Sequence, residues 1–293
     1  MVVNFQKLAL KNSRFHLRND NTALEDEEGV WNYRNMIISN INTKMQQMLI
    51  VGDSLNFYID ELTCKERSGF ELTSFKGHLR LWSAGLYCYS TDFITANNSL
   101  ISTDFGFDYQ TYQSFRDFEN NVRFNTTIHH SILNTKDLTY FVKNFQGMND
   151  NVEVQCEVIG PLSDMKVKKT QILFGENSHF NGNVEMIGLP NIEETFINLD
   201  VDNLKVNIQD IINFHFPKGK NLTISNGIKE LKWIDVHGHF LGLYNNFFAD
   251  ANIKTGLGNL VCELMFNNKV KPITYDGTVS FNRRSSLFSV FNS

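Results

Sequence analysis

The stretch from Asn151 to Phe196 alternates apolar and polar residues with a period of two. Such a period places successive side chains on opposite faces of a β-strand. Gly160-Pro161 and Phe174-Gly175-Glu176-Asn177 interrupt the alternation with turn residues. The stretch therefore predicts strands joined by turns, each with one apolar and one polar face. Its apolar phase holds Val152, Val154, Cys156, Val158, Phe180, Gly182, Val184 and Met186.

The same alternation occurs on both sides of this stretch. It marks segments 55–59, 75–81, 101–107, 122–128, 197–201, 234–240, 249–253, 260–266 and 273–281. Several strands share a motif of an apolar or aromatic residue, a polar residue, Gly, a polar residue and an apolar residue, as in Val236-His-Gly-His-Phe240. Glycine on the apolar face permits a thin wall or a sharp bend in a curved sheet.

Helical spacing is confined to short segments. Apolar residues three to four positions apart predict helices at 112–121, with Ser114 as a possible N-cap, and at 135–145, ending near Gly147. Residues 210–214 fit one helical turn, and 286–291 resemble the start of a helix. The sequence therefore predicts an all-β fold of repeated antiparallel hairpins with two or three short helices.

No linker interrupts this pattern, so we expect one continuous β segment over residues 1–293, with a weak subdivision near residues 110–150 at the short helices. With so few helices, the apolar strand faces have two possible arrangements. Two sheets could pack as a closed sandwich, or one curved sheet could leave an apolar trough. The pattern alone does not choose between them.

Composition and charge narrow the possible partners. The net charge is −5 and no basic stripe is visible, which argues against nucleic acid as a partner. Apolar runs are only a few residues long, well below the ~20 that a membrane helix needs. Phe supplies 25 of the 37 aromatic residues (25 Phe, 9 Tyr, 3 Trp), which favours dry apolar surfaces over hydrogen-bonding sites.

The four cysteines, Cys64, Cys88, Cys156 and Cys262, are isolated and lack metal-ligand spacing. Cys156 and Cys262 fall on the apolar phase of strands, so we interpret them as small buried hydrophobic residues. A long-range disulfide is the alternative.

Candidate catalytic and metal sites are weak. His237 and His239 share one face of a strand, but the sequence places no third metal ligand beside them. Glu193-Glu194 could suggest glycoside chemistry, although neighbouring residues in a strand point apart. The chain has no GxSxG, GxGxxG or Walker motif. We therefore predict a protein without catalytic residues, metal or cofactor.

The segment Gly175-Glu-Asn-Ser-His-Phe-Asn-Gly-Asn-Val-Glu-Met-Ile-Gly-Leu-Pro-Asn-Ile-Glu-Glu-Thr-Phe-Ile-Asn-Leu199 resembles the TamB family of translocation and assembly modules in its Bacteroidota form. Supporting segments are Ser68–Leu72, Gly147–Asp150, Gly238–Phe247 and Thr255–Leu260. The resemblance covers roughly residues 5–281.

The resemblance implies an elongated, curved β-sheet (an AsmA-like half-pipe, or β-taco groove) with an apolar inner face. It also implies a periplasmic location, as part of a protein anchored in the inner membrane, and a role in moving phospholipids to the outer membrane and in outer-membrane biogenesis. The implied partners are phospholipid acyl chains and a TamA- or BamA-like outer-membrane barrel, with no nucleic acid. The implied lipid-binding groove residues are Val152, Val154, Cys156, Val158, Phe180, Val184, Met186, Ile234, Val236, Phe240, Ala251, Ile253, Leu260, Cys262, Leu264 and Phe266.

The chain departs from the family in length. TamB proteins are several times longer, begin with a membrane anchor and end in a further domain, so we expect this chain to be an internal fragment or a truncated reading frame. We consider three functions: a lipid conduit, a scaffold for outer-membrane protein assembly or secretion that holds β-strands at open sheet edges, and a β-sandwich adhesin or carbohydrate-binding module.

Overall fold

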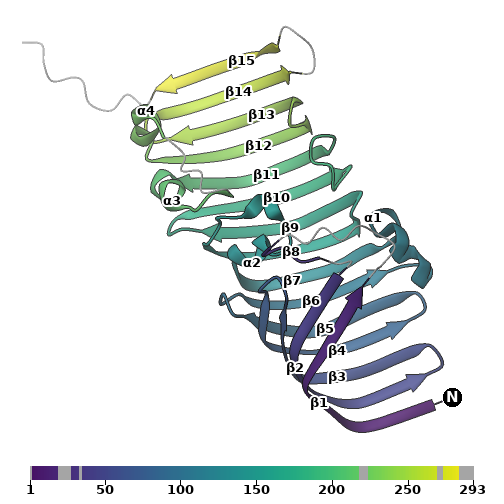
Figure 1. Ribbon diagram of the computed structural model, residues 1–293. Coiled ribbons are helices and arrows are strands. Elements are labelled where there is room, and N and C mark those ends of the chain that lie inside the picture. Colours follow the sequence, from purple (N-terminus) through teal and green to yellow (C-terminus); the bar gives the residue numbers. More distant parts are fainter. Residues whose placement is uncertain (1, 19–27, 33–34, 218–223, 269–272, 284–293) are drawn as a thin grey trace, which may run out of the picture. The chain divides into compact units, whose positions relative to one another are not determined.

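The computed structural model describes residues 2–18, 28–32, 35–217, 224–268 and 273–283 of the chain. These residues form fifteen strands, β1 to β15, whose order in the sheet is their order in the sequence (Figure 1). Each pairing with a defined register is antiparallel. The predicted fold class, an all-β chain of antiparallel hairpins in a curved open sheet, is confirmed, and the described strands do not form the alternative closed sandwich.

The chain divides into two compact units. The first unit comprises Met1–Leu162 and His215–Asn221, and the second comprises Ser163–Phe214 and Leu222–Ser293. The strands of the first unit are β1 Val2–Arg18, β2 Asn35–Val51, β3 Ser54–Glu66, β4 Glu71–Trp82, β5 Gly85–Thr95, β6 Leu100–Asp108, β7 Arg123–Asn134 and β8 Asn151–Pro161. The strands of the second unit are β9 Asp164–Phe174, β10 Ser178–Ile187, β11 Phe196–Asn207, β12 Trp233–Leu243, β13 Asn246–Thr255, β14 Gly258–Asn267 and β15 Thr274–Arg283.

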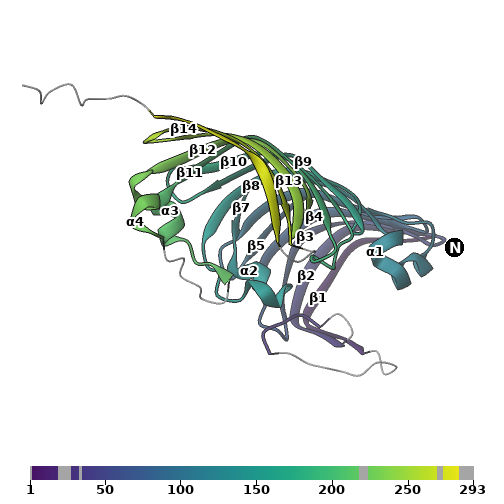
Figure 2. The same ribbon diagram turned by 90° about the horizontal axis from the view of Figure 1, so that it is seen from above.

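In each unit the strands bend, so that one face of the sheet is concave (Figure 2). In the second unit, Gly182 and Gly238 lie in one row across the strands and Gly277 lies in the adjacent row, all on the inward face. A Cβ on these residues would lie 2.2, 2.1 and 2.0 Å from a carbonyl oxygen of the neighbouring strand. Real Cβ atoms do not approach an oxygen this closely, so only glycine permits the neighbouring strands to come this close. The glycines of the repeated motif therefore allow a close approach of neighbouring backbones, as a thin wall of the sheet requires.

β-Bulges provide a source of curvature. Asn12, Ser90 and Lys169 have positive φ angles and lie where the strand register shifts. A bulge bends its strand and increases its twist, but it leaves one backbone N–H without a ladder partner. In all three bulges a side chain of the next strand accepts that hydrogen bond. The three bonds are Asn12 N to Asn42 Oδ1 (2.9 Å), Ser90 N to Asp104 Oδ1 (2.6 Å) and Lys169 N to Asn183 Oδ1 (2.9 Å).

The helices are short and lie in the connections between strands. They are η1 Tyr112–Asp117, α1 Phe118–Asn121, α2 Lys136–Thr139, η2 Lys143–Phe145, α3 Ile208–Asn213 and α4 Asn226–Glu230. The helix predicted at 112–121 is present as η1 and α1, but its N-cap is Thr111, and Ser114 instead completes the capping box. The turn predicted at 210–214 is α3, whereas α4 was missed, and the helix predicted at 286–291 lies outside the described residues.

The single helix predicted at 135–145 is wrong, because the segment forms two separate turns, α2 and η2. Val142 between them is extended, with φ −133° and ψ 104°. Tertiary contacts outweigh the helical spacing here. At one end, Asp137 is buried and accepts hydrogen bonds from Thr95 and Ser99. At the other end, the Phe141 ring stacks on the Trp31 ring, with centroids 5.4 Å apart.

Asp210 in α3 holds the β9–β10 turn. Its carboxylate accepts hydrogen bonds from Ser178 Oγ (2.7 Å) and from the backbone N–H groups of Glu176 and Asn177 (both 3.0 Å). Burial raises the pKa of Asp210, but these hydrogen bonds outweigh it and hold the pKa below its usual range. In the first unit, Asp137 of α2 accepts side-chain hydrogen bonds from Thr95, Asn97 and Ser99 at the β5–β6 turn, so each unit has a buried aspartate that holds a hairpin turn.

We expect the replacement of Gly238 by Ala to lower the free energy of unfolding by about 1–3 kcal/mol, because the new Cβ would meet the Asp250 carbonyl oxygen. Urea unfolding measures this change. The control is Gly227→Ala in α4, where nothing lies within 4 Å of the added Cβ. Equal losses of stability in the two variants would contradict the account of the close approach.

We expect Asp210→Asn to lower the free energy of unfolding by about 1–3 kcal/mol at neutral pH, because the β9–β10 turn loses its buried, charged acceptor. The folded-state pKa of Asp210 is depressed, so its stabilisation exists above the unfolded pKa of ~3.9 and disappears as the pH falls through the folded pKa. Unfolding curves between neutral and acidic pH should therefore converge for the wild type and the variant. Exposed Asp164, changed to Asn, is the control.

Candidate functional site

The concave face of the second unit is a continuous apolar surface. The registers align its inward side chains into four rows that cross β10 to β15. The rows are Phe180–Leu204–Val236–Ile253–Leu260–Phe281, Gly182–Val201–Gly238–Ala251–Cys262–Val279, Val184–Leu199–Phe240–Ala249–Leu264–Gly277 and Met186–Ile197–Gly242–Phe247–Phe266–Tyr275. No polar side chain interrupts them except the hydroxyl of Tyr275.

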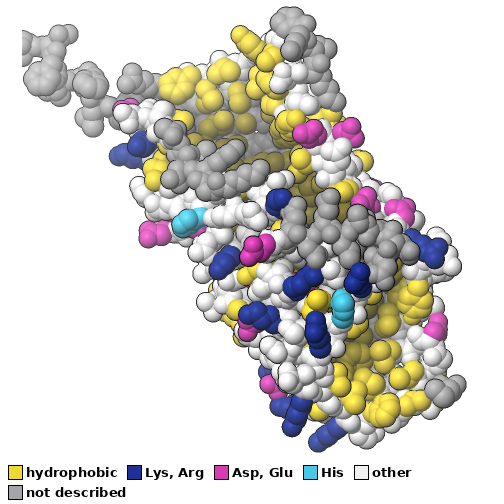
Figure 3. Space-filling view, in the orientation of Figure 1, with side chains coloured by type: hydrophobic (Ala, Val, Ile, Leu, Met, Phe, Trp, Pro, Cys, Tyr) yellow, Lys and Arg dark blue, Asp and Glu magenta, His cyan; other side chains and the backbone are white. Residues whose placement is uncertain are grey.

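These rows have no second sheet above them in the part of the chain that the structure describes. Their large side chains are mostly half-buried, and on β15 they are strongly exposed, with Tyr275 79% and Phe281 60% exposed. Figure 3 shows hydrophobic side chains gathered on this face over β13 to β15. An exposed apolar surface of this extent is typical of a binding site.

The first unit has a similar apolar face. One row crosses eight strands, from Val3 through Ile50, Leu55, Leu81, Leu86, Phe107 and Phe124 to Gly160. Small residues form its deepest part, where Cys88 and Thr91 are 0% exposed, and where Thr103 and Cys156 are also buried. Small residues at the most buried positions and half-buried large residues along this row give the face the form of a trough, and no second sheet covers it in the described residues.

Aromatic residues pack along one rim of the first unit. Trp31 lies against Phe70 and Phe141, with ring centroids 5.6 and 5.4 Å apart, and its backbone N–H donates to the Tyr140 carbonyl (2.7 Å). These residues come from the β1–β2, β3–β4 and β7–β8 connections. The cluster joins three connections that are distant in sequence and fixes this wall of the trough.

The predicted groove residues all lie on these two apolar faces. Cys156 is buried, Leu264 is 37% exposed, and the other fourteen are half-buried. Twelve of them lie in the second unit, where the strands bring them together. Val152, Val154, Cys156 and Val158 belong to β8 in the first unit.

Much of the lining was not predicted from the sequence. No groove role was predicted for Leu199 and Leu204 of β11, for Phe247 of β13, or for Val279 and Phe281 of β15, although each completes a row. The alternation of these strands was visible in the sequence. What the sequence did not contain was the register, which decides which alternating residues become neighbours.

The two histidines weighed as metal ligands lie on the polar face of the second unit, where each contacts an aspartate. His237 Nε2 lies 3.2 Å from Asp235 Oδ1, and His239 Nε2 lies 3.2 Å from Asp200 Oδ1. Within the described ranges, no group of three His, Cys, Asp or Glu side chains could hold a metal ion. Glu193 and Glu194 are exposed in the β10–β11 connection.

All four cysteines are free thiols. Burial raises the pKa of Cys64, Cys88 and Cys156, so these thiols are poor nucleophiles. Cys156 is buried as expected, whereas Cys262 is only half-buried because its row is uncovered.

Comparisons of this chain with protein-family models, with curated proteins and with solved structures found no match. The resemblance to the TamB family therefore stays a prediction. None of the helices in the described residues has the length and apolar character needed to cross a membrane.

We expect a maleimide reagent to modify Cys262 in the native protein much faster than Cys88. Cys262 lies on the uncovered apolar face, whereas Cys88 is 0% exposed and its thiol pKa is raised by burial. Peptide mapping after brief labelling measures both sites in one sample, and labelling in urea is the control for intrinsic reactivity. Equal protection of the two thiols would show that the face over β13 and β14 is covered.

Proposed function

We propose that the chain is a non-enzymatic lipid-binding protein whose apolar troughs hold the acyl chains of phospholipids. The observation that carries this proposal is the set of four adjacent apolar rows over β10 to β15, which no second sheet covers in the described residues. An uncovered surface of this kind favours a ligand that is itself long and apolar.

Binding is favourable because it removes the apolar surfaces of the acyl chain and of the trough from water. Each methylene group that an acyl chain buries contributes ~0.8 kcal/mol. The rows run across the strands, so a chain lying along one row contacts apolar side chains from successive strands without crossing a charged one. Headgroups would remain at the open side of the trough, in water.

Lipid transport between two membranes is the biological role that agrees best with such a trough. The resemblance to the TamB family supports a periplasmic conduit between the inner and outer membranes, acting with a TamA- or BamA-like barrel. In this role the chain supplies a path and performs no chemistry. The competing scaffold role would require an extended protein segment as the bound cargo.

The first experiment is mass spectrometry of the chain purified under native conditions, which should show copurified phospholipid. We expect Leu264→Asp to reduce the bound lipid at least several-fold while the protein stays folded, because Leu264 faces the trough and is already 37% exposed. Thermal unfolding checks the fold.

Val261→Asp is the matched control, because Val261 lies on the same strand, is 51% exposed and points to the opposite face. It should bind lipid like the wild type. Copurified peptide without lipid would favour the scaffold role. Equal lipid loss in both variants would contradict binding on the concave face.

A further inference from the structure

The polar face of the first unit carries aromatic rings on three neighbouring strands. On each strand these residues alternate with the side chains that line the trough, so they lie on the opposite face of the sheet. No second sheet covers this face in the described residues. We call the five residues the outer aromatic strip: Tyr58 of β3, His78 and Trp82 of β4, and Tyr87 and Tyr89 of β5.

The rings of the strip contact one another in an unbroken series. The centroid distances are 4.2 Å for Tyr58–His78, 6.2 Å for His78–Tyr89, 5.6 Å for Tyr89–Tyr87 and 5.5 Å for Tyr87–Trp82. The His78–Tyr89 pair is tilted by 47°, whereas the planes of the other three pairs lie within 10–19° of parallel. The strip therefore consists of two nearly parallel groups of rings that meet at His78 and Tyr89.

Two glycines make room for two of the rings. A Cβ on Gly85 would lie 2.4 Å from the Trp82 ring, and Gly85 is the cross-strand partner of Trp82. A Cβ on Gly106 would lie 2.3 Å from the ring of its own partner, Tyr87. Each ring therefore lies against the backbone of the next strand, in the space that a side chain would fill. Any larger residue at either position would displace the ring.

Tyr87 is also held at its hydroxyl group. The hydroxyl donates to Asp108 Oδ1 (2.7 Å) and accepts from Asn125 Nδ2 (3.1 Å). Burial and the hydrogen bond to Asp108 raise the pKa of Tyr87 to about 12, so the hydroxyl stays protonated at neutral pH. In the other group of rings, His78 Nε2 lies 2.6 Å from Asn56 Oδ1. Rings held in this way are pre-organised, so a ligand that stacks on them does not have to order them first.

Polar and charged side chains lie between and beside the rings. The strip borders a hollow of about 600 Å³, which Asp60 and Lys76 also line. Arg80 separates His78 from Trp82 along β4, and its guanidinium carbon lies 5.9 Å from the centroid of the Trp82 ring. These groups offer hydrogen-bond donors and acceptors at the edges of the rings.

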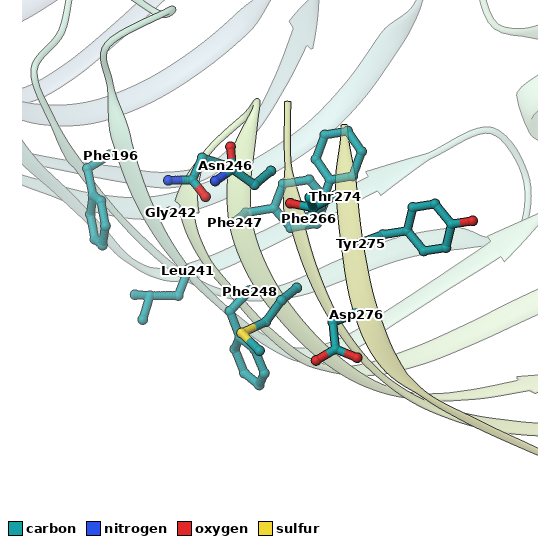
Figure 4. A pocket seen from close by; sticks show the side chains of 12 residues that line it. Phe196, Leu241, Gly242, Asn246, Phe247, Phe248, Phe266, Thr274, Tyr275 and Asp276 are labelled. Atoms are coloured by element: carbon teal, nitrogen blue, oxygen red, sulfur yellow. The ribbon is translucent and has the colours of Figure 1, made fainter. Parts of the chain in front are cut away.

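The lining of this hollow differs from that of a hollow at the strand ends of the second unit. The latter, of about 500 Å³, is surrounded by Phe247, Phe248, Phe266 and Tyr275 (Figure 4). Among the described residues that line it, Asp276 is the only charged one. An apolar lining suits an acyl chain, whereas rings mixed with charged groups suit a ligand that has both apolar faces and polar edges.

The charges on the outer face of the first unit have both signs. Lys76 lies directly opposite Asp92 on the next strand, and Asp60 and Arg80 are exposed on β3 and β4. A single-stranded nucleic acid would need a basic surface that follows its phosphates. The surface here is mixed, so it favours a ligand without net charge.

We infer that the outer aromatic strip binds a neutral glycan. A pyranose ring has faces of C–H groups, whose partial positive charge packs on the negative faces of aromatic rings. Its hydroxyl groups lie at the edge, where they need donors and acceptors such as Asp60, Lys76 and Arg80. A protein partner would favour an interface centre without charged side chains. The strip lies on the face opposite to the trough, so the inference does not depend on lipid binding.

The test is electrophoresis of the full chain in native gels that contain laminarin, hydroxyethyl cellulose, mannan or dextran. At least one of these neutral polysaccharides should retard the wild type. Tyr58→Ala/Tyr89→Ala should bind that polysaccharide at least about tenfold more weakly, because two stacking surfaces are lost. Tyr58→Phe/Tyr89→Phe keeps both rings and should retain most of the binding.

The matched control is Tyr112→Ala. Tyr112 is 49% exposed in η1 of the same unit but lies outside the strip, so this variant should bind like the wild type. Thermal unfolding checks the fold of each variant. Tyr58→Ala alone replaces the double variant if the latter unfolds, because Tyr58 is the most exposed ring of the strip, at 42%.

Mobility of the wild type that none of the four polysaccharides changes would overturn the inference. So would equal binding by the wild type and the Ala variant, or an equal loss in Tyr112→Ala. Binding of oligodeoxythymidylate that the Ala variant loses would assign the strip to single-stranded nucleic acid instead, and would also overturn it. The inference is separable from the proposed function, since Tyr58→Ala/Tyr89→Ala should still copurify with phospholipid.

Discussion

The structure depends on how a single sheet can bury strands that each have one apolar face. Nearly every strand has one apolar face, and hydrophobic burial normally removes such faces from water by packing a second layer on them. Here all described strands belong to one sheet, and the helices are too short to form that layer. Curvature is the remaining way to bring apolar side chains together. It buries the small residues at the bottom, such as Cys88 and Thr91, and leaves the larger residues of the walls partly exposed.

Curvature in turn requires local exceptions to regular strand geometry. Gly182, Gly238 and Gly277 let neighbouring backbones approach closely, and the bulges at Asn12, Ser90 and Lys169 add twist elsewhere. Each bulge N–H is satisfied by a side chain of the next strand. The polar face of the sheet therefore also helps to shape the apolar one, since its Asn and Asp residues hold the bulges in place.

The strands and the polarity of their faces were predictable because a period of two is a local property. The inward phase of Val152, Phe180 and Leu260 could be read from a few residues on either side. Pairing register could not, so the rows that join Leu204 to Val236 appeared only in the structure. The helix predicted at 135–145 was wrong for a different reason. The apolar residues do have helical spacing, but Asp137 and Phe141 are held by partners distant in sequence.

The order of strands in the sheet has an evolutionary consequence. Each strand pairs with its sequence neighbours, so no described pairing spans an intervening strand. A gene duplication that inserts one more hairpin would thus lengthen the sheet without breaking existing pairs, as in repeat proteins where each unit contacts only the next. Stepwise growth of this kind allows the length of the molecule to change while its cross-section is conserved.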